Sequence, residues 1–543
     1  LKLLLRKFNA IIFFMNREIK KEMVISGGKL ALGYIGLLTG IIGIVLLIPL
    51  FVSISLPLER KYWWNFFAPA IIMIICGFST FLGLLYKKEH GQLSNRQSSF
   101  IVLTSWIISI LGTAVPFWSS GLLNFHQSIF EVSSGWTTTG MSVLDVEQGN
   151  IYSFLTLRAL CMLFGGIGII LVMISVFSDR YGLRLYSAEG HGDSFLPNLL
   201  RSARLMFAIY IGLITVGIIS YMIFGMSFFD AFVHSITAVA TGGFSNYNDS
   251  IAHFSIENGY NIIQVCGIQV TSIILMFSGS ISFISFAFLL RGDFKTFFKN
   301  FENHAELVIL VIVIPLILIL SITSNTVTSN NALMYSVFFT ISAMSTTGFQ
   351  IMSIDINTLN PAICFIFILI MLIGCQSSST CGGIKVGRIS LLYHSLVIKL
   401  RNSANNLNIK RADYVNVYGK DMFLDEALLH DNNIFILTYL GIYLAGAFLF
   451  TLGGSSLNQS LFESASMIST IGFSTGMVNL SSPTYYYYVG ASLMIFGRFE
   501  LFMVIYGIIY IFSIPFNKIK LLLSRRTVSY THLRAHETDS YLV

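Results

Sequence analysis

Long apolar blocks alternate with short polar segments along most of the chain. A helix needs about 20 apolar residues to cross roughly 30 Å of hydrocarbon, and most of the blocks reach that length. The block at 361–373 reaches it if the span continues beyond a break. The pattern predicts a membrane protein with ten spans, at residues 31–52, 66–86, 100–118, 152–177, 205–225, 262–290, 306–322, 361–373, 432–452 and 485–512.

Four short segments between these spans share one pattern. Each is an apolar stretch of ten to twelve residues that leads to Thr-x-Gly or Thr-Gly-Gly, with a span before it and a span after it. The stretch is too short to cross the bilayer, so it predicts a half-helix that enters the membrane and returns through an extended loop. The last glycines of the four patterns are Gly140, Gly243, Gly348 and Gly472.

The four segments also agree in register away from these glycines. A threonine stands two residues before each glycine, at Thr138, Thr241, Thr346 and Thr470. A hydroxyl residue stands six before it, at Ser134, Thr237, Ser342 and Ser466. Helix-start residues precede the segments, at Asn124, Ser227, Asn330 or Asn331, and Asn458. One such cluster would be explained by close helix packing, whereas four in register indicate internal repeats.

The expected fold is an all-α polytopic membrane protein. Four M1–pore helix–M2 repeats form a pseudo-fourfold arrangement, and two N-terminal transmembrane helices precede them. We expect the last part of the C-terminal tail, which is polar and rich in His and Arg from residue 527 onward, to be non-native. The expected boundaries are 1–99 for the two-span domain, 100–190, 191–300, 301–412 and 413–520 for the repeats, and 521–543 for the tail.

The residue types of the repeated segments favour a cation pathway. A dehydrated cation needs several oxygen ligands, which backbone carbonyls supply, and glycine adopts the backbone angles that turn carbonyls inward. The half-helices would also aim their partly negative C-terminal ends at the centre. The candidate filter residues are Thr138, Thr139, Gly140, Thr241, Gly242, Gly243, Thr346, Thr347, Gly348, Thr470, Ile471 and Gly472.

Composition and charge agree with a membrane location. Apolar residues make up 55% of the chain and charged residues only 11%, and the formal charge is +7. The basic residues gather in every second segment between the predicted spans, that is, on one side of the membrane, which predicts that both termini are cytoplasmic. The basic residues are therefore topology signals rather than a nucleic-acid surface. We also expect the first apolar block to be a retained anchor. The six cysteines lack metal-site spacing, and we expect them to be packing residues.

Two features inside the spans carry open alternatives. Polar and small residues between Gly374 and Gly383 predict an intramembrane loop below the filter, or else a simple span end followed by a cytoplasmic loop. Arg498 lies in the middle of the last span, where a charge costs about 3 kcal/mol or more. It would be a repulsive charge in the pore, or an ion pair with Glu131 or Glu463.

Three further polar residues belong to the predicted repeats. Glu131 and Glu463 stand nine residues before the glycines of repeats 1 and 4, and His234 stands there in repeat 2. They would attract cations to the pore mouth, or cap and brace the pore helices. Arg158 is expected to brace these helices as well.

The chain resembles the Trk/Ktr/HKT superfamily of potassium transporters over roughly residues 100–517, and its two extra N-terminal spans resemble the Trk-type branch. The four repeated segments carry this resemblance. So do Gln376-Ser-Ser-Ser-Thr-Cys-Gly-Gly-Ile-Lys385-Val-Gly-Arg388 and Gly497-Arg498-Phe-Glu500. The resemblance identifies the intramembrane loop as a gate, formed by Gly374, Gln376, Ser377, Ser378, Ser379, Thr380, Gly382, Gly383 and Lys385.

The resemblance also implies a function and partners. Potassium would be the transported ion, with Gly140 favouring potassium where some plant relatives carry serine. The protein would be a homodimer in the lipid of the bacterial plasma membrane, regulated by a separate nucleotide-binding subunit of the TrkA/KtrA type. Met141 and Thr470-Ile-Gly-Phe473 depart from the usual pattern, which leaves the potassium-over-sodium preference open.

Other functions fit the chain less well. An intramembrane hydrolase needs a nucleophile with a base at span depth, and no such arrangement occurs, so we expect no enzyme activity and no bound organic cofactor. A secondary transporter of a small organic solute more often has inverted repeats, whereas these repeats are parallel. Sodium permeation, or coupling to sodium or protons, remains an alternative within the same fold.

Overall fold

The computed structural model describes most of the chain. The described residues are 24–25, 27–85, 89–90, 95–147, 151–168, 199–325, 327–353, 359–404, 413–499 and 501–511. The predicted tail, Glu500 and the second part of the predicted span 152–177 lie outside them. Apart from two short strand pairs, β1 (Val24–Ile25) with β2 (Glu89–His90) and β3 (Tyr414–Val417) with β4 (Lys420–Phe423), the regular elements described are helices.

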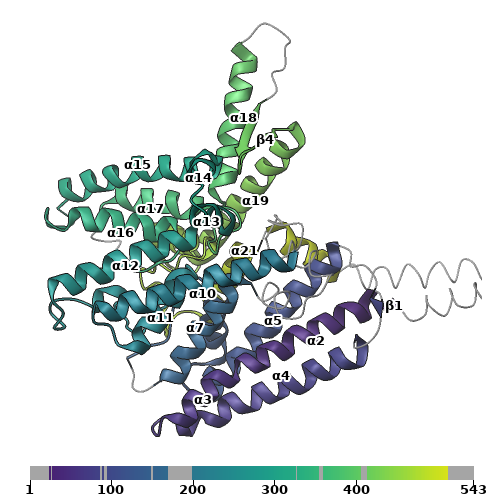
Figure 1. Cartoon of the computed structure of the whole chain (residues 1–543). Coiled ribbons are helices and arrows are strands. Elements are labelled where there is room, and N and C mark those ends of the chain that lie inside the picture. The colour runs from purple at the N-terminus through teal and green to yellow at the C-terminus, as the bar shows by residue number, and fades with distance from the viewer. Residues whose placement is uncertain are drawn as a thin grey trace, which may run out of the picture.

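The N-terminal helices form a hairpin beside the rest of the protein. It consists of α2 (Gly27–Val45), α3 (Leu47–Ser55), the short η1 (Arg60–Tyr62) and α4 (Trp63–Leu84). Helices α2 and α4 lie side by side (Figure 1). Their contact depends on small residues, because a methyl group on Gly36 would come within 2.8 Å of the Gly77 carbonyl oxygen.

Twelve of the other described helices form four sets, each with a long helix, a short helix and a further helix. They are α5 (Asn95–Ser119), α6 (Phe125–Trp136) and α7 (Tyr152–Ile167); α10 (Leu199–Ile223), α11 (Phe228–Val239) and α12 (Ile262–Ser280); α15 (Phe301–Thr323), α16 (Ala332–Met344) and α17 (Pro361–Ile373); and α19 (Glu426–Thr451), α20 (Leu457–Ile468) and α21 (Thr484–Arg498). Helices α13 (Phe283–Leu290), α14 (Phe294–Lys299) and α18 (Val386–Ala404) and the short η2 (Ser250–His253) lie between these elements. In Figure 1, α18 and the start of α19 project from one end of the molecule with the β3–β4 hairpin.

Most predicted spans are long helices in the structure. Within the described residues, seven helices are long and apolar enough to cross a membrane, and an eighth is counted if α21 and the helix Leu501–Ile511 form one span. These two helices are bent by 113° relative to each other. The predicted last span, 485–512, therefore corresponds to two helices that meet at an angle just after the charged residue Arg498. Helix α17 ends at Ile373 and α18 begins at Val386, which places a break where the polar run was found.

The four short helices, α6, α11, α16 and α20, are 12 or 13 residues long, as the half-helix pattern predicts. Asn124 and Ser227 directly precede α6 and α11, and Asn331 precedes α16. The fourth start was predicted wrongly at Asn458, because Ser456 caps α20 by accepting a hydrogen bond from the Gln459 amide.

Candidate ion pathway

The four short helices end in the same backbone turn. In each, the amide one residue before the final glycine donates to the carbonyl of the hydroxyl residue six before it, over 2.8–3.0 Å. This bond is typical of a helix C-terminus at which the residue before the donating amide has a left-handed conformation. A threonine occupies that left-handed position in every repeat: Thr138, Thr241, Thr346 and Thr470, with φ of 55°, 51°, 53° and 53°.

A left-handed β-branched residue is a strained conformation that costs on the order of 1–3 kcal/mol. Each threonine is followed by a residue with negative φ and then by the final glycine, with φ of 84°, 73°, 83° and 90° for the four repeats. Alternation of the sign of φ turns successive carbonyls toward the same side of the chain. The same strained geometry, repeated four times, is consistent with a surface of carbonyl oxygens.

The final glycines bring the four segments into one ring. A side chain on Gly140 would overlap the carbonyl oxygen of Gly242, and one on Gly243 would overlap that of Thr347. The same overlap relates Gly348 to Ile471 and, finally, Gly472 to Thr139 of the first repeat. The repeats therefore follow one another around the ring in sequence order, and only glycine leaves room for the neighbouring carbonyl.

Buried side chains hold the outer exits of this ring. Glu131 accepts hydrogen bonds from Ser142 Oγ and from the Val143 amide, both at 2.9 Å. Glu463, in the same register, accepts from Ser474 Oγ at 2.9 Å and from the Thr475 amide at 2.7 Å. These carboxylates thus brace the loops that leave the ring, which was one of the two interpretations of the sequence.

Repeats 2 and 3 use other partners for the same purpose. His234 Nε2 lies 2.9 Å from Ser245 Oγ. In repeat 3 the equivalent residue is Phe339, and residues of repeat 2 hold the loop instead. The backbone amide of Gln350 donates to Ser250 Oγ at 3.2 Å, and its backbone carbonyl accepts from the Ala252 amide at 3.1 Å. The outer loops are therefore linked to one another across repeats.

Arg158 is a buried brace of repeat 1. Its Nε lies 2.9 Å from Glu131 Oε1, and its guanidinium lies over the Phe244 ring at 3.8 Å from the centroid. It also donates to the Ser245 carbonyl at 3.2 Å, so it connects repeats 1 and 2. Glu131 thus pairs with Arg158, and Glu463 bonds to its own loop.

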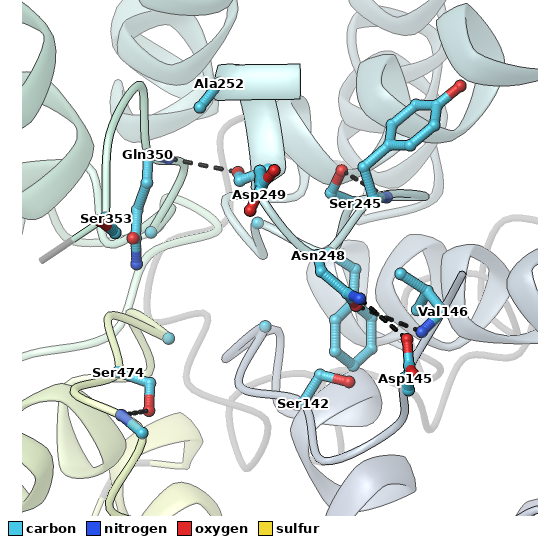
Figure 2. A pocket seen from close by; sticks show the side chains of 18 of the residues that line it. Ser142, Asp145, Val146, Ser245, Asn248, Asp249, Ala252, Gln350, Ser353 and Ser474 are labelled. Carbon is cyan, nitrogen blue, oxygen red and sulfur yellow. Dashed lines mark hydrogen bonds between the residues drawn. The ribbon is translucent and has the colours of Figure 1, made fainter. Parts of the chain in front are cut away.

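A cavity of about 1190 Å³ opens on the outer side of the ring, and all four final glycines line it. Its wall carries the carboxylates of Asp145, Asp249 and Glu257, against the buried and paired Arg158. Figure 2 shows Asp145 and Asn248 facing each other across two repeats, with a hydrogen bond of 2.8 Å between them. The excess of carboxylates gives the cavity a potential that attracts cations.

A second polar group supports the outer loop of repeat 2. Asp230 accepts hydrogen bonds from Asn246 Nδ2 at 2.9 Å and from Tyr247 Oη at 3.2 Å. Burial, and then the nearby Asp230 carboxylate, raise the pKa of Tyr247 above its ordinary value. The phenol therefore stays a neutral hydrogen-bond donor to Asp230 at neutral pH.

On the inner side, residues 374–385 form a closed loop inside the protein. Its ends are joined by three backbone hydrogen bonds, from Ile384, Lys385 and Val386 to the carbonyls of Leu372, Ile373 and Cys375, at 3.0, 2.9 and 2.8 Å. Gly374 and Gly383, with φ of 68° and 80°, lie so close that a side chain on either would meet the other's backbone. Most of the loop is buried, and Lys385 donates to the Cys381 carbonyl.

The loop reaches three of the four strained threonines. Thr380 Oγ1 lies 3.1 Å from Thr241 Oγ1, and the Gly382 amide donates to Thr346 Oγ1 at 3.0 Å. A side chain on Gly382 would overlap Thr470 Oγ1. The hydroxyls of Thr138 and Thr470 have no hydrogen-bond partner among the described residues. The loop therefore lies directly beneath the ring.

Arg498 ties this loop to repeat 1. As the last residue of α21, it donates to the carbonyls of Thr380 at 2.7 Å, Gly165 at 2.5 Å and Gly166 at 2.7 Å. Gly165 and Gly166 belong to the last turn of α7. Their carbonyls lie at the end of α7, where a positive charge is favoured.

Two loop contacts were missed from the sequence. Glu302 accepts a hydrogen bond from the Ser377 amide at 3.1 Å, and Glu306 accepts one from the Gln376 side chain. Gln376 Oε1 in turn accepts from the Ser282 amide at 3.0 Å. The sequence signal that could have revealed these contacts is the pair Glu302 and Glu306, two carboxylates one helical turn apart at the start of an apolar span.

Comparison with known proteins agrees with this architecture. The model of the TrkH family, described as cation transport proteins, matches residues 64–514. The chain is 26% identical over 468 residues to an uncharacterized cation transporter of Methanocaldococcus jannaschii, covering 86% of this chain and 92% of the relative. It is 28% identical over 376 residues to the Trk system potassium uptake protein TrkG of Escherichia coli, covering 68% and 74%.

A solved structure shows the same fold. The crystal structure of the potassium transporter TrkH from Vibrio parahaemolyticus matches with a TM-score of 0.75 and 21% sequence identity, over 88% of this chain and 98% of that one. The family match covers more than half of the chain and includes all four repeats. This polytopic all-α membrane protein therefore belongs to the TrkH family of cation transport proteins.

Proposed function

We propose that the protein carries potassium ions into the cell through the ring formed by its four repeated segments. The observation that carries the proposal is the cyclic contact of the four final glycines, each against a carbonyl oxygen of the next repeat. The relatives named as potassium uptake proteins support potassium as the ion.

The ion's path follows from the charges and oxygens along it. Cations gather in the outer cavity, where Asp145, Asp249 and Glu257 lower their energy. Carbonyl oxygens of the ring then replace water around the ion. The hydroxyls of Thr138 and Thr470, which have no hydrogen-bond partner among the described residues, offer further oxygen ligands at the inner end of the ring.

The intramembrane loop is the proposed gate. Thr380 and Gly382 contact the inner ends of three repeats, so an ion leaving the ring meets the loop before it reaches the cytoplasm. Conduction then requires the loop to move away, against the hydrogen bonds from Arg498 and to Glu302 and Glu306.

The proposal includes an assembly. We place the protein in the bacterial plasma membrane as a homodimer with both termini in the cytoplasm. A separate nucleotide-binding subunit of the TrkA/KtrA type would act on the loop from the cytoplasmic side. Relatives named as members of a Trk system support a multi-component system.

Uptake of rubidium tests the transported ion and the ring together. The protein is expressed in bacteria that lack their own potassium uptake systems, and rubidium uptake is measured at low external potassium. Gly348→Ala, whose new methyl group overlaps the Ile471 carbonyl, should lower uptake at least about tenfold, since such sites tolerate only about 0.5 Å of displacement.

Gly121→Ala is the matched control. Gly121 has a φ of 77°, close to the 83° of Gly348, but nothing lies within 4 Å of its added methyl group. Both variants carry the same backbone strain, and only Gly348→Ala disturbs the ring. Equal uptake by the two variants at equal membrane levels would reject the ring as the pathway, and sodium uptake without rubidium uptake would reject potassium as the ion.

A further inference from the structure

Two buried cysteines lie at the base of the intramembrane loop. Cys375 and Cys381 are 1% and 2% exposed and flank Gln376–Thr380. Cys375 Sγ donates to the Met344 carbonyl at 2.8 Å, and Cys381 Sγ donates to the Ser345 carbonyl at 3.0 Å. The acceptors belong to consecutive residues, Met344 at the end of α16 and its C-cap Ser345. The two thiols therefore lie at the same end of α16, each within hydrogen-bond distance of one of two adjacent carbonyls.

The backbone around this pair closes the base of the loop. The Val386 amide donates to the Cys375 carbonyl at 2.8 Å, and the Ile384 amide donates to the Leu372 carbonyl at 3.0 Å. A disulfide needs its two Cα atoms within about 7 Å and its Cβ atoms directed toward each other. Two thiols that bond to adjacent carbonyls at the closed base of a loop can approach this geometry by a movement of their side chains.

We propose that Cys375 and Cys381 form a reversible disulfide that locks the intramembrane loop beneath the ring. The effect on transport rests on the proposed function of the loop as the gate. The disulfide itself does not depend on that function.

The reaction is a thiol–disulfide exchange with a small disulfide oxidant such as glutathione disulfide. The thiolate of one cysteine attacks the oxidant, forms a mixed disulfide and releases one small thiol. The second cysteine displaces the second small thiol and closes the bond, so two protein thiols are oxidised and one disulfide is reduced. Lys385 places a positive charge beside this pair by donating to the Cys381 carbonyl.

The disulfide acts on the part of the loop that meets the filter. Cys381 stands between Thr380, which contacts Thr241, and Gly382, whose amide donates to Thr346. A bond from Cys381 to Cys375 closes this segment into a covalent ring and so restricts the rearrangement of Thr380 and Gly382 that withdrawal of the loop requires. Oxidation should therefore lower ion flux, and reduction should restore it.

The remaining cysteines provide a clean background. Cys76 and Cys266 are exposed, and Cys161 and Cys364 are buried in α7 and α17. Replacement of Cys76 and Cys266 by serine removes the accessible thiols and leaves the pair intact. In this background, Cys375→Ser and Cys381→Ser each remove one partner and keep the size of the side chain.

The test uses the full chain in membranes, treated with glutathione disulfide and then with dithiothreitol. Mass spectrometry of the peptide that spans Cys375 and Cys381 measures the disulfide, and rubidium uptake measures flux. We expect the bond to form, uptake to fall about tenfold and dithiothreitol to restore it. Both single variants should keep their uptake under oxidation.

Three results would overturn the proposal: no linked peptide, an equal loss of uptake in Cys375→Ser, or a linked peptide with unchanged uptake. Failure of the transport proposal is recognised separately. In that case the reduced protein takes up no more rubidium than Gly348→Ala, while the mass spectrum still reports whether the disulfide forms.

Discussion

Replacement of Arg498 by alanine should raise rubidium uptake. The guanidinium donates to the Thr380 carbonyl of the intramembrane loop and to the Gly165 and Gly166 carbonyls at the end of α7. The bond to Thr380 fastens the loop to a neighbouring repeat. Alanine removes this bond and also removes a positive charge beneath the ring, and both changes favour the passage of cations.

The size of the effect follows from the bond to the loop. A hydrogen bond to a charged group contributes about 1.5–3 kcal/mol, and every 1.4 kcal/mol changes an equilibrium about tenfold. If loop withdrawal breaks the Thr380 bond alone, its loss shifts the closed–open equilibrium by about 10- to 150-fold. If the unchanged protein already populates the open form, the gain in flux of Arg498→Ala is smaller than this shift.

Arg498→Lys separates the bond from the charge. Lysine keeps the positive charge but lacks the planar fork that reaches three carbonyls at once. If the bond network restrains the loop, Arg498→Lys should approach Arg498→Ala in uptake. If the charge alone limits the flux, Arg498→Lys should resemble the unchanged protein.

The assay is initial rubidium uptake, normalised to the amount of protein in the membrane. The thermal midpoint of unfolding is measured for each variant as a control for stability. Stable, correctly inserted Arg498→Ala with unchanged or lower uptake would refute the reasoning. A variant with a lowered midpoint and no uptake would show that the three carbonyl contacts mainly hold α21 and α7 together.

Two further predictions concern buried carboxylates. Glu463→Gln should lower the preference for rubidium over sodium, because it replaces the charged acceptor of the hydrogen bonds from Ser474 and from the Thr475 amide by a neutral one. Rubidium uptake is measured with and without competing sodium, and inhibition by sodium equal to that of the unchanged protein would contradict this prediction. Glu59→Gln should lower the free energy of unfolding by about 1–3 kcal/mol, because Glu59 accepts from two amides at the start of α7. Thermal unfolding in detergent measures this loss, and the exposed Glu257→Gln should leave the midpoint nearly unchanged.

Several site residues could be recognised from the sequence because their signals are local. The four Thr-x-Gly or Thr-Gly-Gly patterns have the same register as the four left-handed threonines and final glycines of the structure. The polar run after Ile373 lies at the break between α17 and α18. Arg158 was expected to brace the pore helices, and it pairs with Glu131.

Other contacts join residues that are far apart along the chain. Thr380 meets Thr241, Gln376 meets Glu306, and Arg498 meets Gly165 across 333 positions. No local pattern specifies such pairs, since a polar residue in an apolar span can be satisfied by any neighbour that the fold supplies. The bend after Arg498 was not predicted, because the hydropathy of a segment does not give the direction of its helices.

The sequence by itself determined the class of the protein, the number of repeats and the residues of the ring. Hydropathy measures whether a segment prefers lipid, and repeated glycines mark backbone that other residues cannot adopt. Only the tertiary structure decided the order of the repeats around the ring, the partners of the buried charges and the closed base of the loop. These depend on which groups packing brings within hydrogen-bond distance, because a buried polar group must find its partner wherever the chain passes.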